Sequence, residues 1–103
     1  SHYIAEFSNQ PHLKVVHEPA NAFSNYWLNA LILDSTAAHA RDAILNSLND
    51  CGFAARPIWN PMHTLDIYSG HPRGTLSVTE DLASRIINLP SSAGLADSLR
   101  CLS

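Results

Sequence analysis

Apolar residues follow one another closely in four stretches of the chain, and these stretches predict β-strands. The strongest is residues 26–33, which is apolar on both faces apart from Asn29 and therefore predicts an interior strand. Three shorter stretches predict the remaining strands, at residues 13–17, 53–59 and 87–89. Because Pro57 has no N–H to donate to a ladder, its strand is expected either to lie at the edge of the sheet or to turn out of the sheet at this residue.

Apolar residues return every three or four positions between residues 34 and 52, which is typical of a helix with one buried face. The stripe consists of Ala37, Ala40, Ile44, Leu48 and Cys51. Residues 34–36 are candidate caps at its start, and Gly52 suits the left-handed conformation that ends many helices. Cys51 is expected to be buried at the apolar end of this helix.

Four further helical segments are predicted, at residues 3–8, 61–68, 77–85 and 94–102. The third begins with a capping box, in which Ser77 caps the first turn and Glu80 reaches back to it. Mixed strands and helices joined by short returns predict the α+β class. We expect a single domain over residues 1–103, built as a two-layer sandwich with a small, mostly antiparallel sheet and helices packed on one face.

Composition and charge argue against nucleic-acid and membrane partners. The formal net charge is −3, and the six Lys and Arg residues are spread singly rather than clustered as phosphate-backbone binding requires. No apolar run approaches the ~20 residues that span a bilayer. Two cysteines make no disulfide framework, so a cytoplasmic location is expected. The six histidines lack the spacing of metal ligands, so no metal site is predicted. The loop at residues 70–74 lacks the glycine spacing of phosphate-binding loops, so it is expected to be a plain connection.

Four segments of the chain together form a recognisable pattern. They are Asn25-Tyr26-Trp27-Leu28 with the apolar strand after it, the helix from Arg41-Asp42 to Cys51-Gly52, Arg56-Pro57-Ile58-Trp59 with Pro61-Met62-His63, and Glu80 to Arg85 leading to Leu89-Pro90-Ser91-Ser92. In this order and spacing they resemble the small C-terminal domain of DegT-type sugar-nucleotide aminotransferases, which depend on pyridoxal phosphate (PLP). The resemblance covers nearly the whole chain. It implies that the intact family transfers an amino group to a keto-deoxysugar nucleotide for surface-polysaccharide biosynthesis.

The family's large domain, which holds PLP through a Schiff-base lysine, has no counterpart in this sequence. The sole lysine, Lys14, lies in a predicted strand and matches no Schiff-base motif of the family. We therefore expect no catalytic residue and no cofactor in this chain, which would be a truncated or isolated small domain that is not catalytic alone. The alternative is a stand-alone nucleotide-sugar binding or protein-interaction module.

Arg56, Trp59 and His63 form the candidate substrate-binding cluster, because the resemblance implies that this segment lies near the mouth of the active site. An arginine can clamp a diphosphate, a tryptophan can stack on a base or sugar, and a histidine can donate a hydrogen bond. The alternative is an interface strand with a structural arginine and a packed tryptophan. The hydroxyl of Tyr26 is a fourth candidate contact, although mid-strand tyrosines are usually core or interface residues. Asp66, three positions after His63, could orient the imidazole, but no Ser or Cys nucleophile motif accompanies the pair.

Apolar surface is expected to remain exposed on this chain. Residues 26–33 are apolar on both sides, and residues 3–8 resemble the last turns of a longer helix. Exposed apolar patches beyond a few hundred Å² usually mark interfaces. The sequence therefore predicts self-association as a homodimer, through surface that the large domain covers in the intact family.

Overall fold

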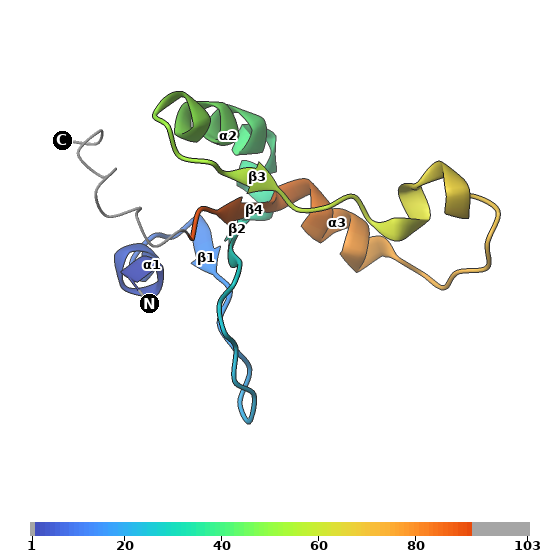
Figure 1. The fold of residues 1–103 in the computed structure, drawn as a ribbon, viewed down its shortest axis with the longest axis horizontal. Helices are drawn as coiled ribbons and strands as arrows, with labels where there is room; N and C mark the ends of the chain where they lie inside the picture. Colours follow the sequence, from blue (N-terminus) through green and yellow to red (C-terminus); the bar gives the residue numbers. More distant parts are fainter. Residues whose placement is uncertain (1, 92–103) are drawn as a thin grey trace.

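The sheet at the centre of the molecule has four strands, β1 (Leu13–Val15), β2 (Asn29–Leu33), β3 (Arg56–Pro57) and β4 (Ile86–Leu89). The computed structural model describes residues 2–91, so the helix predicted at residues 94–102 lies outside the described part of the chain. The strand order is β1-β2-β4-β3, and every pairing is antiparallel (Figure 1). The prediction of an interior strand near residue 30 and of an edge position for Pro57 is confirmed.

The register of the sheet places the strand residues of the core cluster on one face, while the neighbouring Ile86 is buried on the other. Leu31 pairs with Val15 on one side and with Ile87 on the other, and alternate residues along each strand face the same way. The helices α1 (His2–Phe7) and α2 (Arg41–Asp50) pack their apolar residues against this face. The core cluster consists of Val15, Leu31, Leu33, Leu45, Ala55, Ile87 and Leu89. The predicted α+β class, a small antiparallel sheet with packed helices, is confirmed.

The predicted helix at residues 34–51 divides into a 3₁₀ helix, η1 (Ser35–Ala40), followed by α2. Gly52 has φ +88° and ends α2 in the left-handed conformation, as predicted. Asp34 precedes η1, but its carboxylate accepts hydrogen bonds from the hydroxyls of the next two residues and caps no backbone N–H. The expectation that Cys51 is buried is wrong: it follows α2 as the C-cap residue, is exposed to solvent, and its thiol is free.

Helix α3 (Ser77–Arg85) has the predicted bounds but not the predicted cap. Its N-cap residue is Leu76, whose side chain caps nothing, and Ser77 is already helical. The carboxylate of Glu80 is bonded to His63 instead of reaching back along its own helix. The capping box is therefore wrong, because a tertiary partner holds the residue that the motif needs.

Two arginines fasten the helices to each other and to the sheet. Arg41 at the start of α2 donates to the carbonyl of Ala83 in α3 at 2.8 Å. Arg85 at the end of α3 donates to the carbonyl of Leu33 in β2, also at 2.8 Å, while Asp81 accepts two bonds from the same guanidinium. Nε and Nη2 both donate to Oδ2 of Asp81, and this contact lowers the pKa of Asp81 and raises that of Arg85. Helix α3 is thus held firmly at its C-terminal end.

Two long connections project from the sheet, and we call them the first arm (residues 16–28) and the second arm (residues 58–76) (Figure 1). The first arm joins β1 to β2, and the second joins β3 to α3 through the short 3₁₀ helices η2 (Met62–Thr64) and η3 (Asp66–Tyr68). The strands predicted at residues 26–33 and 53–59 are shortened because parts of them belong to these arms. The radius of gyration is 15.4 Å, against ~13 Å for a compact domain of 100 residues, as projecting arms require.

Candidate functional site

A cavity of about 330 Å³ lies where the two arms leave the sheet, and we call it the Trp59 cavity. The first arm contributes Leu28, the second arm contributes Trp59, and strand β4 contributes Asn88. Its full lining is Leu28, Ala54, Arg56, Pro57, Trp59, Asn88, Leu89, Pro90 and Ser91. The cavity therefore combines apolar and aromatic walls with a few polar groups, which is typical of small-molecule sites.

The guanidinium of Arg56 is positioned beside this cavity by a short hydrogen-bond chain. Its Nη1 donates to the side-chain oxygen of Asn49 at 3.0 Å and to the carbonyl of Ala55 at 3.1 Å. Asn49 in turn donates to the carbonyls of Leu45 and Ala55. Among the described residues, no partner bonds Nε or Nη2 of Arg56. Arg56 thus has both a structural bond to helix α2 and donors left for a ligand.

Asn88 is the polar group that sequence reasoning missed in this cavity. It pairs directly with Arg56 across β3 and β4, so the two side chains leave the same face of the sheet. Its amide makes no hydrogen bond within the described part of the chain, and an amide offers both donors and an acceptor. A polar residue inside the apolar run of residues 86–89 was the available signal.

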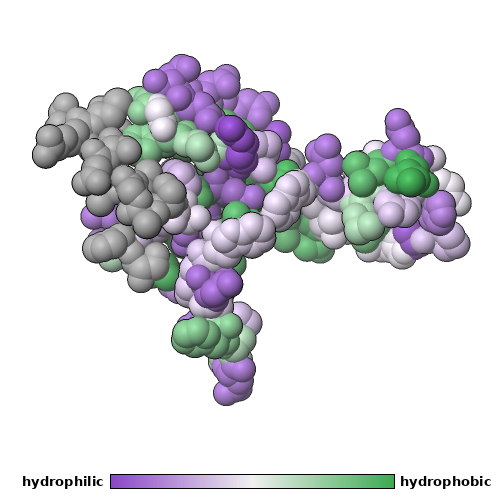
Figure 2. Space-filling view, viewed as in Figure 1, coloured by the Kyte–Doolittle hydropathy of each residue, from purple (hydrophilic) through white to green (hydrophobic). Residues whose placement is uncertain are grey.

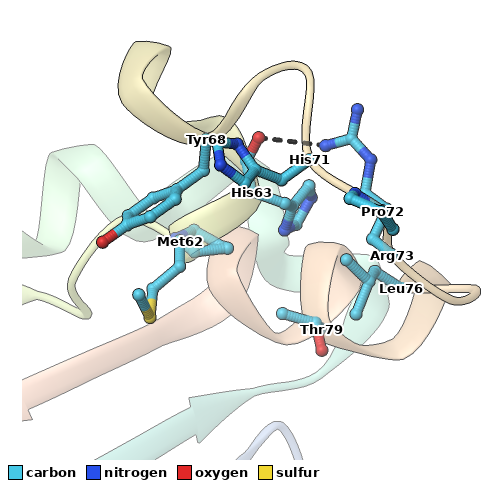
Figure 3. Close-up of a pocket in the computed structure, with 9 residues that line it drawn as sticks. Met62, His63, Tyr68, His71, Pro72, Arg73, Leu76 and Thr79 are labelled. Atoms are coloured by element: carbon cyan, nitrogen blue, oxygen red, sulfur yellow. Dashed lines mark hydrogen bonds between the residues drawn. The ribbon is translucent and has the colours of Figure 1, made fainter.

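His63 lies in a different cavity, also about 330 Å³, between the second arm and α3 (Figure 3). Its Nε2 is 2.9 Å from Oε1 of Glu80, and its side chain is only 12% exposed. Arg73 donates to the backbone carbonyl of His63 at 3.0 Å, and the rings of His71 and Tyr68 meet edge to face at 5.6 Å. The His63–Glu80 contact ties the second arm to the first turn of α3, and the other two contacts stabilise the arm itself.

The predicted cluster is therefore divided between two places. Arg56 and Trp59 share one cavity, whereas His63 lines the other, with His71 and Arg73. The loop at residues 70–74, predicted as a plain connection, supplies both of these basic residues. Glu80, not Asp66, is the carboxylate that orients His63.

Tyr26 lines neither cavity and stabilises the first arm instead. Its hydroxyl oxygen accepts a hydrogen bond from the backbone N–H of Glu18 at 3.2 Å. Its φ is +49°, a left-handed conformation that is strained for a residue with a bulky side chain. Trp27, the next residue, is exposed rather than in the core. Tyr26 is thus first of all a structural residue of the arm.

Neither cavity is lined by a lysine, the residue that holds PLP in the family. Lys14 is exposed on β1 and lines neither cavity, so no amine lies where a Schiff base would need it. Within residues 2–91, no three His, Cys, Asp or Glu side chains gather as metal ligands would. No helix in that part of the chain is both long and apolar enough to cross a membrane.

The fold matches one portion of solved sugar aminotransferases. DesI, crystallised in the presence of its TDP-sugar product, superposes with a TM-score of 0.76 at 26% identity, over 95% of this chain and 28% of that one. Helicobacter pylori PseC, an aminotransferase involved in pseudoaminic acid biosynthesis, also gives 0.76, at 19% identity, over 97% of this chain and 29% of that one. At that identity, the PseC match establishes the fold alone.

The chain belongs to the DegT/DnrJ/EryC1/StrS aminotransferase family, whose sequence model matches residues 1–99. It is 33% identical over 96 residues to a GDP-perosamine synthase of Vibrio cholerae, across 92% of this chain and 26% of that protein. It is 36% identical over 86 residues to the putative PLP-dependent aminotransferase EpsN of Bacillus subtilis, across 78% of this chain and 21% of that protein. The chain spans about a quarter of the length of such relatives.

Proposed function

We propose that this chain is the small-domain part of a sugar-nucleotide aminotransferase and that it contacts the sugar nucleotide rather than the cofactor. The similarity to GDP-perosamine synthase over 92% of the chain carries this proposal. In the intact enzyme, PLP bound elsewhere would carry the amino group from a donor amino acid to a keto-deoxysugar. We place the protein in the cytoplasm, where a sugar-nucleotide substrate would be available to it.

The Trp59 cavity is the proposed contact with the sugar nucleotide. Trp59 is 68% exposed and offers an open ring face for a nucleobase or sugar. Arg56 has donors left for a diphosphate oxygen, and its bond to Asn49 holds the guanidinium in place. Because His63 and Tyr26 lie outside this cavity, any contact they make would be with another part of the ligand.

A titration tests the proposed contact. In a Trp27→Phe variant, Trp59 is the sole tryptophan, so quenching of its fluorescence reports binding of GDP-sugars, TDP-sugars or the free nucleotides. We expect saturable quenching that Arg56→Ala weakens and Lys14→Ala, a matched loss of an exposed cation, leaves unchanged. A flat titration with every nucleotide would remove the proposal of a contact at this cavity.

The chain alone is proposed to have no transaminase activity. No lysine lines either cavity, and a lysine amine is the group that would hold PLP covalently in this family. Incubation with PLP should therefore produce no Schiff-base absorption band beyond that of a matched Lys14→Arg control. A borohydride-reducible band that depends on Lys14 would contradict this point.

A stand-alone nucleotide-sugar binding module is the second candidate. The observation that favours it is the Trp59 cavity itself, which brings Arg56, Trp59 and Asn88 together. The two candidates differ in the affinity of the chain by itself. A free-standing module should bind as tightly alone as with any partner, whereas a small-domain part should gain affinity when the rest of the enzyme is supplied.

A further inference from the structure

Asn88, which lines the Trp59 cavity, interrupts an otherwise apolar strand. It is half-buried in β4 between the buried residues Ile87 and Leu89, and asparagine is depleted in strands because it packs poorly there. Within residues 2–91, its amide has no hydrogen-bond partner that would explain its place in the sheet. Positions that break a local sequence preference without a structural benefit are often functional.

The neighbours of Asn88 in the sheet leave its amide open. Ala30 lies beside it on β2 and offers only a methyl group, which cannot hydrogen-bond and covers little of the amide. Arg56 lies beside it on β3, but the Nη1 donor of that guanidinium is already bonded to Asn49. The donors and the acceptor of the Asn88 amide are therefore available to a molecule in the cavity.

The surface around the cavity is mixed in character. Figure 2 shows hydrophilic surface beside hydrophobic surface in the region where the two arms meet the sheet. Leu28 and Pro57 supply apolar lining, whereas the hydroxyl of Ser91 donates to the carbonyl of Trp27 at 2.8 Å and fixes the root of the first arm. Such a lining suits a ligand that joins a flat ring to groups that form hydrogen bonds.

The order of groups in a nucleotide places its pentose beside Asn88. In the proposed function, the base stacks on Trp59 and the diphosphate binds Arg56, and the pentose is the part that joins these two groups. Asn88 and Arg56 are direct cross-strand neighbours, whose Cβ atoms are about 4.5–5.5 Å apart. An amide at that spacing is within reach of the pentose hydroxyls when the diphosphate is held by Arg56.

We propose that Asn88 sets the pentose specificity of this chain by binding the 2′- and 3′-hydroxyls of a ribose. The proposal rests on the proposed function and narrows its substrate class. A 2′-hydroxyl both donates and accepts hydrogen bonds, and the amide supplies an acceptor and donors to match it. The chain therefore prefers GDP- and UDP-sugars, which contain ribose, to TDP-sugars, which contain 2′-deoxyribose.

Pairs of nucleotides that differ only in the 2′-hydroxyl test this role. GDP with 2′-deoxy-GDP, and UDP with 2′-deoxy-UDP, are titrated into the Trp27→Phe chain while the fluorescence of Trp59 is followed. We expect each ribonucleotide to bind about tenfold more tightly than its deoxy partner, because the missing hydroxyl leaves the amide partly unpaired. The ratio should be the same for both bases, which separates recognition of the pentose from recognition of the base.

Variants at position 88 assign the preference to the amide. Asn88→Leu removes the donors and the acceptor at similar volume, and it should reduce the preference for ribose to less than about twofold. Asn88→Asp keeps an acceptor for the hydroxyls, so it should weaken both members of a pair through its charge and keep the preference. Asn46→Leu, the same change at an exposed position of α2, should leave the preference unchanged. Circular dichroism of each variant checks that the fold is retained.

Three results would overturn the role of Asn88. One is saturable binding with equal affinity for the two members of each pair, and another is a preference for ribose that survives Asn88→Leu. The third concerns the hexose, which also carries neighbouring hydroxyls: Asn88→Leu weakens GDP-mannose but leaves GDP and its ribose preference unchanged. A flat titration with every nucleotide removes the proposed function as well, whereas binding that is indifferent to Asn88 removes this role alone.

Discussion

The two isoleucines at positions 67 and 87 offer the same chemical change in opposite surroundings. Ile87 is 0% exposed in β4, at the centre of the core cluster, whereas Ile67 projects from the second arm. Truncation to alanine removes three carbons, at ~0.8 kcal/mol each for lost burial, and a cavity adds to this. We therefore expect Ile87→Ala to lower the free energy of unfolding by about 3–4 kcal/mol and Ile67→Ala to change it by less than about 0.5 kcal/mol.

A loss of that size should consume most of the stability of this domain. Domains of about 100 residues are stable by ~5–15 kcal/mol, and a core of nine buried apolar residues in the described part of the chain favours the lower end. Urea unfolding followed by far-UV circular dichroism is the appropriate assay, because both tryptophans are exposed and report poorly on the core. Equal losses for the two variants, or a loss below about 1 kcal/mol for Ile87→Ala, would refute the assignment of core and arms.

Three smaller changes test the supporting contacts. Tyr3→Phe removes the 2.7 Å bond that ties α1 to the end of β4, and a loss of about 1 kcal/mol is expected in urea unfolding. Asn49→Ala removes the acceptor that holds Arg56 and two hydrogen bonds to backbone carbonyls, so the free energy of unfolding should fall by about 1–2 kcal/mol. It should also weaken the quenching of Trp59 by nucleotides, and unchanged quenching would show that Asn49 does not position the Arg56 guanidinium for binding. The hydrogen bond from Arg85 lowers the pKa of Asp81 below its ordinary value of 3.8. The contact therefore stabilises the fold fully above that pH, and the stabilisation is lost as the pH falls through the lowered pKa. Asp81→Asn should make the urea midpoint less dependent on pH in the acid range, and an unchanged dependence would contradict the pairing.

The sequence predicted the sheet but misjudged one end of its interior strand. An apolar run predicts that side chains are buried, but it does not distinguish burial in the core of the domain from burial at an interface. Trp27 and Leu28 continue the run of β2, yet they are exposed on the first arm. The same ambiguity made a two-residue strand at Arg56–Pro57 look seven residues long.

Local motifs were reliable only where no distant residue competed for them. Gly52 ends α2 as predicted, because its left-handed backbone depends on the residue itself. The capping box failed because Glu80 is bonded to His63, 17 positions away. Pattern reading does not see such a tertiary partner.

The candidate site could be predicted in part. Arg56 and Trp59 lie in one segment, so the sequence could place them together. Asn88 joins them only through the register of β3 with β4, and Leu28 only through the return of the first arm. His63 follows Trp59 closely in sequence but turns into the second arm, and the sequence did not reveal that division.

Amino transfer by the reconstituted complex tests the central claim most directly. The Vibrio cholerae GDP-perosamine synthase without the 26% of its length that this chain matches, this chain, and the two together are each supplied with PLP, an amino donor and the relative's sugar-nucleotide substrate. We predict amino-sugar product only when both chains are present, and less of it when this chain carries Arg56→Ala. Product from this chain alone, or a stable complex that forms none, would contradict the account.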